Sequence, residues 1–195
     1  MPFLHEAGVT RHVPRQTLAT VRVAVVGDAQ VGKTFLCRSL TAASHTASNS
    51  AYDMTTTPVA TLHAVPLPSS SPPAQVIFIL VDFPGAASFN IRPPDALLAD
   101  SGAVALCFDV GVRESLTSAG KWVRRVHEAR AAARVEGELP VALIGLNRSN
   151  VSGDAAVSAA DAGAAAAALN AKCFFVEDSA ESVAAPFVWL AEHVK

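Results

Sequence analysis

The chain has 195 residues, of which 51% are hydrophobic and 16% charged, and its net charge is -2. This length and composition predict one soluble globular domain with a sizeable core. Because the two signs of charge are nearly balanced, no basic stripe is available for a nucleic-acid backbone, and nucleic acid is not an expected partner.

Short apolar runs alternate with segments of helical spacing along the chain. Residues 1–20 mix His, Arg, Pro and Glu, and we treat them as an N-terminal extension of a domain at residues 21–195. Apolar runs predict strands at residues 21–26, 59–65, 76–81, 104–108 and 141–144. Helical spacing or alanine content predicts helices at residues 33–40, 122–133, 155–169 and 187–194, with Pro186 in the first turn of the last one.

The order of these elements predicts the fold class. Strands that alternate with helices form a doubly wound α/β sheet, and nearly continuous apolar runs are typical of parallel strands covered on both faces. Residues 66–73 contain four prolines and predict a long exposed hairpin loop. Ligands of such sheets bind at the carboxyl ends of the strands, so the chemistry is expected there.

The strongest motif is GDAQVGKT at residues 27–34, which matches G-x-x-x-x-G-K-[ST] between a predicted strand and a predicted helix. Its glycines let backbone N–H groups and the helix N-terminus point at phosphates. Lys33 is expected to reach the β- and γ-phosphates, and the Thr34 hydroxyl is expected to ligate Mg²⁺. The predicted phosphate-binding residues of this loop are Asp28, Ala29, Gln30, Val31, Gly32, Lys33 and Thr34.

A second motif, DFPG at residues 82–85, ends the strand that starts at Val76. Asp82 can hold Mg²⁺ through water, and the Gly85 amide can face the γ-phosphate, as in a conformational switch that senses that phosphate. On its own the motif is weak, because other strands also end in an aspartate before a proline turn. Its position about fifty residues after the phosphate loop favours the switch interpretation.

A third candidate is the threonine run at residues 55–57, between the first helix and the second strand. A nucleotide switch needs one hydroxyl there to bind Mg²⁺ in the triphosphate state, and we choose Thr55. The alternative is that these are ordinary β-branched residues that lead into a strand.

These motifs, followed in order by NRSN at residues 147–150 and by a Ser-Ala pair at Ser179 and Ala180, resemble the Rab-like small GTPases over residues 21–195. The resemblance implies a P-loop small GTPase (Ras-like) fold of class α/β, with a mostly parallel six-stranded sheet and helices on both faces. It also implies GTP or GDP and Mg²⁺ as cofactors. A P-loop ATPase or kinase of another family is the alternative, but it would leave the threonines and the Ser-Ala pair accidental.

The resemblance assigns guanine recognition to Asn147, Arg148, Asn150, Ser179 and Ala180, where the family has N-K-x-D and S-A. The apolar part of Arg148 can lie over a purine as a lysine does. Asn150 is the serious departure, since an amide offers one acceptor and a donor where an aspartate offers two acceptors to guanine. We therefore expect guanine binding to survive in weakened form, because mispaired buried polar groups are costly.

Within the Rab-like group, the chain is most similar to the Rab-like subunit of intraflagellar transport complex B. The similarity lies in YDMTTTPVATLHAVPLP at residues 52–68 and in APF at residues 185–187. It implies a small β-sandwich subunit and the larger transport particle as partners, in the cilium or flagellum. The last residues, 190–195, contain no cysteine, so no direct lipid anchor is expected.

The position after D-x-x-G, where the family has a glutamine that orients the attacking water, is Ala86. We name no catalytic residue and expect at most a slow GTPase. Two functions remain open: a slow switch, and a nucleotide-stabilised structural subunit without turnover. A general Rab-like vesicle-traffic GTPase is a further alternative. The odd set of three cysteines, Cys37, Cys107 and Cys173, favours a reducing compartment, which is the cytoplasm in each case.

Overall fold

A computed structural model describes residues 15–42, 58–68, 70–85, 95–147 and 156–194. One six-stranded sheet of order β2-β3-β1-β4-β5-β6 forms its centre. Its strands are β1 (Gln16–Val26), β2 (Val59–Leu67), β3 (Ala74–Asp82), β4 (Ala103–Asp109), β5 (Val141–Leu146) and β6 (Lys172–Val176). The helices are α1 (Lys33–Ala42), α2 (Asp95–Ala99), α3 (Arg113–Ala132), α4 (Ala159–Ala168) and α5 (Ala180–His193).

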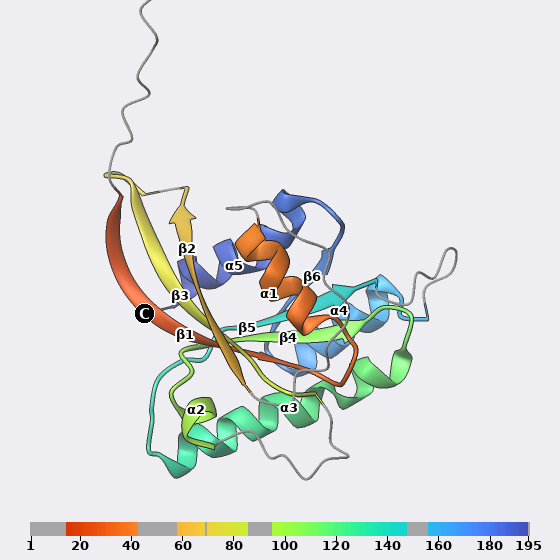
Figure 1. The fold of residues 1–195 in the computed structure, drawn as a ribbon. Helices are drawn as coiled ribbons and strands as arrows, with labels where there is room; N and C mark the ends of the chain where they lie inside the picture. The colour runs from red at the N-terminus through yellow and green to blue at the C-terminus, as the bar shows by residue number, and fades with distance from the viewer. Residues whose placement is uncertain (1–14, 43–57, 69, 86–94, 148–155, 195) are drawn as a thin grey trace, which may run out of the picture.

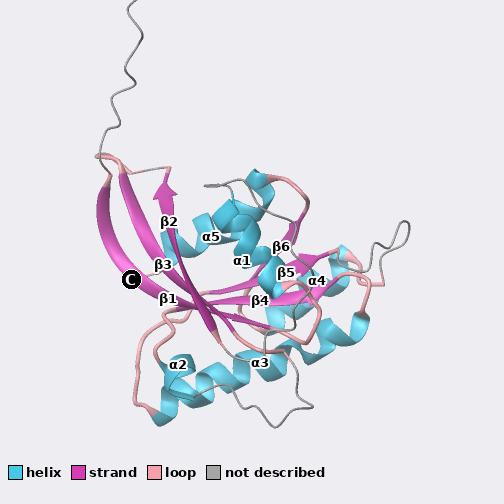
Figure 2. Ribbon diagram, viewed as in Figure 1, coloured by secondary structure: helices cyan, strands magenta, loops and turns pink. Residues whose placement is uncertain are grey.

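Helices cover both faces of this sheet (Figures 1 and 2). Side chains alternate along a strand, so Val23 and Val25 of β1 face α1 and α5, whereas Ala24 and Val26 face α2, α3 and α4. Among the described strands, β2 runs antiparallel to its neighbour β3, and the other pairs are parallel. The predicted α/β class, with a mostly parallel six-stranded sheet and helices on both faces, is confirmed.

The first strand is longer than its apolar run predicted. β1 begins at Gln16, five residues before the predicted start at Val21, and pairs with β3 from Gln16↔Ala74 onward. The added residues are mostly exposed, so they lack the apolar signal that marks a buried strand. Residues 16–20 are therefore part of the sheet, although we placed them in the N-terminal extension.

The predicted loop at residues 66–73 is also shorter than expected. β2 continues through Pro66 to Leu67, and its register with β3 ends at Leu67↔Ala74, so the connection covers residues 68–73. A proline cannot donate to a sheet ladder, but β2 is an edge strand, where that loss is tolerated. The local sequence did not reveal the edge position.

The last helix corrects the prediction for Pro186. α5 begins at Ala180 with Ser179 as its N-cap, whose side chain accepts a hydrogen bond from the Ser182 amide. Pro186 therefore lies inside the helix and is buried, instead of lying in the first turn. Serine is a preferred N-cap residue, so Ser179 marks the start of the helix. A proline in a helix interior costs one backbone hydrogen bond, but it can be retained where packing favours it.

Other helices also differ from their predictions. α3 begins at Arg113, nine residues before the predicted start at Trp122. α2 was not predicted, because five residues are too short for a periodic pattern. α4 begins after Ser158, its N-cap, and spans residues 159–168 of the helix predicted at residues 155–169. Among the described helices, none combines the length and the apolar character that crossing a membrane requires.

Candidate functional site

The phosphate loop lies between the end of β1 and the start of α1. Three of its residues have positive φ angles: Gly27 at 144°, Gln30 at 66° and Gly32 at 102°. Such a path turns successive backbone N–H groups inward, and the first turn of α1 adds donors that have no acceptor within the helix. The loop therefore has the backbone shape of an anion site at a helix N-terminus.

Lys33, the first residue of α1, points into this loop. The residue is 6% exposed, and its Nζ atom donates a hydrogen bond to the Asp28 carbonyl at 2.7 Å. Burial lowers the pKa of Lys33, while nearby acidic groups, Asp82 and Asp28 among them, act to raise it. A buried ammonium group is costly without anions around it, so this position fits a phosphate contact.

The predicted Mg²⁺ side of the site is formed by Thr34 and Asp82. The Thr34 hydroxyl donates to Oδ2 of Asp82, which is 4% exposed at the end of β3. Asp82 is in register with Val25 of β1, so the pairing of β1 with β3 brings the two residues together. A hydroxyl and a carboxylate are hard oxygen ligands that fit Mg²⁺, with phosphates and waters completing its shell.

No group of three or more His, Cys, Asp or Glu side chains gathers at one place in the described part of the chain. Among the described residues, the Thr34 hydroxyl and the Asp82 carboxylate, the latter through water, fit an ion that is also bound by a phosphate. Thr34 and Asp82 would hold that ion, and the ion would supply positive charge to the phosphate oxygens.

Gly85 lies against the phosphate loop. A Cβ atom added at Gly85 would stand 2.4 Å from the Asp28 carbonyl carbon and 2.5 Å from the Ala29 nitrogen. Only a residue without a side chain allows this close approach. The D-x-x-G glycine thus reaches the phosphate loop. That its amide faces the γ-phosphate stays a prediction.

The predicted base-recognition residues come from two neighbouring strands. Asn147 directly follows β5, and Ser179 and Ala180 form the N-cap and first residue of α5, just after β6. β5 and β6 are parallel, with Leu146 opposite Val176, so both loops emerge at the same end of the sheet. Three other predicted site residues, Thr55, Arg148 and Asn150, lie outside the described residues, as does Ala86.

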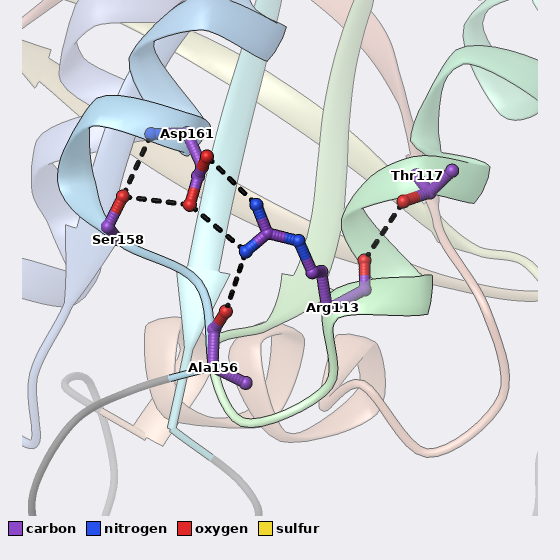
Figure 3. Close-up of polar contacts among 5 residues, drawn as sticks. All are labelled: Arg113, Thr117, Ala156, Ser158 and Asp161. Atoms are coloured by element: carbon purple, nitrogen blue, oxygen red, sulfur yellow. Dashed lines mark hydrogen bonds and ion pairs between the residues drawn. The ribbon is translucent and has the colours of Figure 1, made fainter.

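The sequence analysis missed a set of polar contacts that joins the start of α3 to the start of α4 (Figure 3). We call it the anchor. The Arg113 guanidinium donates to the Ala156 carbonyl at 3.2 Å and pairs with the Asp161 carboxylate at 2.9 Å. Asp161 in turn accepts from the Ser158 hydroxyl at 2.8 Å and donates its amide to that oxygen at 3.1 Å. The pair Ser158 and Asp161 has capping-box spacing, so half of the anchor was visible in the sequence.

This anchor yields a pH prediction for Asp161→Asn. The hydroxyl of Ser158, aided by Arg113, lowers the pKa of Asp161. A carboxylate whose pKa is lower in the folded state adds stability above its unfolded pKa of about 3.9 and loses it as pH falls through the folded value. We expect the variant to have a slightly lower thermal midpoint at pH 7, and the difference to disappear in acid.

Thermal melts at a series of pH values would test this prediction, with Glu128→Gln, an exposed change on α3, as the control. The pair is exposed, at 57% for the Arg113 side chain and 38% for Asp161, so added salt should shrink the difference too. A difference that persisted unchanged at the lowest pH of folding would contradict the assignment.

Comparison with protein-family models identifies a family for most of the chain. A family model described as the Ras family matches residues 22–195 of the chain. No curated protein matches the chain. The matched range contains the phosphate loop, the D-x-x-G motif and both base-recognition loops, and it favours the small GTPase interpretation over a P-loop ATPase or kinase.

Proposed function

The chain belongs to the Ras family of small GTPases, and from this premise we propose that it is a guanine-nucleotide-binding, Rab-like subunit of the intraflagellar transport machinery. In this proposal it holds GTP or GDP with Mg²⁺ and acts in the assembly of the cilium or flagellum and in cargo transport. The main support for nucleotide binding is that Lys33, Thr34 and Asp82 lie close together at one end of the sheet.

The assignment to intraflagellar transport is supported by sequence similarity alone. It draws on residues 52–68, which lead into and include β2, and on residues 185–187 within α5. The proposed partners are the small β-sandwich subunit and the larger particle, and the proposed locations are the cytoplasm and the cilium or flagellum. A Rab-like role in general vesicle traffic remains the alternative.

The proposed rate of hydrolysis is very low. Ala86 follows D-x-x-G and has no group that could orient an attacking water. The same residue, together with Asn150, supports a second candidate: a structural subunit that is stabilised by nucleotide and never turns it over. In both candidates the phosphate loop binds nucleotide. They differ in whether the γ-phosphate changes the affinity for the partner.

Nucleotide titration of the purified protein would test the first part. We expect fluorescently labelled GTP and GDP to bind in the presence of Mg²⁺ and labelled ATP not to bind. XTP should bind about as well as GTP if Asn150 has relaxed base discrimination, since its amide no longer offers two acceptors to guanine. Failure of every nucleotide to bind would reject the proposal.

Partner affinity would separate the switch from the scaffold. The protein would be titrated with the β-sandwich subunit, once loaded with GDP and once with a non-hydrolysable GTP analogue. A switch predicts different affinities, whereas equal affinities support the scaffold, because a ligand without differential affinity shifts no equilibrium. No complex in either state would reject the assignment to intraflagellar transport.

A further inference from the structure

The side chain of Asp28 is directed from the phosphate loop to α3. Its Oδ1 atom accepts a hydrogen bond from the Trp122 indole N–H at 2.8 Å, and its Oδ2 atom accepts one from the Ser118 hydroxyl. Ser118 and Trp122 are four residues apart, so they lie on one face of α3. Both carboxylate oxygens of Asp28, a residue of the phosphate loop, thus accept hydrogen bonds from side chains of α3.

The backbone of Asp28 contacts Lys33 and Gly85, the two residues proposed to meet the phosphates of the nucleotide. The Asp28 carbonyl accepts from the Lys33 ammonium at 2.7 Å. Gly85 approaches the peptide that joins Asp28 to Ala29 so closely that an added Cβ would overlap it. A shift of this one peptide would therefore misplace both the phosphate-binding lysine and the D-x-x-G glycine.

A carboxylate near bound phosphates is unfavourable unless it is held away from them and its charge is compensated. Hydrogen bonds to a charged acceptor are about twice as strong as neutral ones, and the two donors come from a helix of 20 residues. α3 is therefore a rigid support that keeps the Asp28 carboxylate turned from the nucleotide.

We propose that Asp28, Ser118 and Trp122 form a positioning triad: through Asp28, the two α3 residues fix the loop peptide that orients Lys33 and meets Gly85. None of the three side chains contacts the nucleotide. This inference rests on the proposed function, because it concerns the geometry with which the loop holds phosphates.

Beyond the triad, α3 also contacts α2. One turn after Trp122, Arg125 pairs with Asp95 at the start of α2 at 2.9 Å. α3 thus contacts the phosphate loop at one point and α2 at another. A change at the triad is expected to alter nucleotide dissociation more than overall folding.

Trp122→Phe is the sharpest variant, because it removes the indole N–H and keeps an aromatic ring in the partly buried position. We expect labelled GDP to dissociate about tenfold faster, which is the usual effect of losing one hydrogen bond to a charged acceptor. The matched control is Trp189→Phe, since Trp189 lies on α5 beside Phe174 and His193. The control should dissociate at the unaltered rate.

A double-mutant cycle and a fluorescence signal give readouts that a general loss of stability would not produce. Asp28→Ala and Trp122→Phe together should have the same effect as Asp28→Ala alone, because they break one interaction. Asp28→Asn should recover part of the loss, since its amide oxygen still accepts. In Trp189→Phe, Trp122 is the sole tryptophan of a chain that has two, and adding Asp28→Ala should shift its emission, because the indole N–H loses its acceptor.

Tight binding in the unaltered protein with an unchanged rate in Trp122→Phe would overturn this inference and leave the proposed function standing. Additive effects in the double variant, or a Trp122 emission that Asp28→Ala leaves unchanged, would overturn it as well. Absence of guanine-nucleotide binding in the unaltered protein would overturn both the proposed function and the inference.

Discussion

Lys33→Met should weaken nucleotide binding by roughly a hundredfold or more while leaving the nucleotide-free protein folded. The ammonium group is expected to bond both the β- and γ-phosphates, and each hydrogen bond to a charged group contributes about 1.5–3 kcal/mol. Methionine keeps an unbranched side chain of similar length in the buried position. The measurement is a titration with a labelled non-hydrolysable GTP analogue, which carries both phosphates, with Lys121→Met, an exposed lysine on α3, as the control.

The stability of the nucleotide-free variant makes this test specific. Burial lowers the pKa of Lys33, which means that the folded protein without nucleotide holds this charge at a cost. Removing the charge relieves that cost, so the thermal midpoint without nucleotide should not fall. In the unaltered protein GDP should raise the midpoint, and in Lys33→Met it should hardly do so. Unchanged affinity in Lys33→Met would contradict the assigned role.

Gly27→Ala should destabilise the fold by about 4 kcal/mol, from steric overlap and backbone strain together. A Cβ at Gly27 would stand 2.3 Å from the Cys107 carbonyl oxygen of β4, and the residue has a φ of 144°. The neighbouring atom is backbone in the centre of the sheet, so it cannot move aside cheaply. Since a domain is typically stable by 5–15 kcal/mol, this change would remove a large share of the total.

Urea unfolding of three glycine variants would separate the causes. Gly137→Ala has a φ of 104° but no atom within 4 Å, so it should show the strain alone, about 1–2 kcal/mol. Gly163→Ala lies within α4 with open space around it and should stabilise the protein by roughly 1 kcal/mol. A cost for Gly27→Ala no larger than that for Gly137→Ala would show that the overlap with Cys107 is relieved by movement.

The positions of the central strands and of the phosphate loop followed from the sequence because their signals are local. A buried parallel strand needs a continuous apolar run, and residues 104–108 and 141–144 are such runs within β4 and β5. The start of β1 and the end of β2 were misplaced for the converse reason. Their outer residues are exposed, and only pairing with β3 makes them strands.

By itself, the sequence determined the order of the phosphate-binding groups, because the loop needs glycines, a lysine and a threonine at fixed spacing between a strand and a helix. Only the tertiary structure decided which side chains support them. Trp122 and Asp28 are 94 residues apart, and Arg113 and Asp161 are 48 apart. No local pattern specifies such pairs, since they form only when the parallel strands bring separate loops and helices to the same end of the sheet.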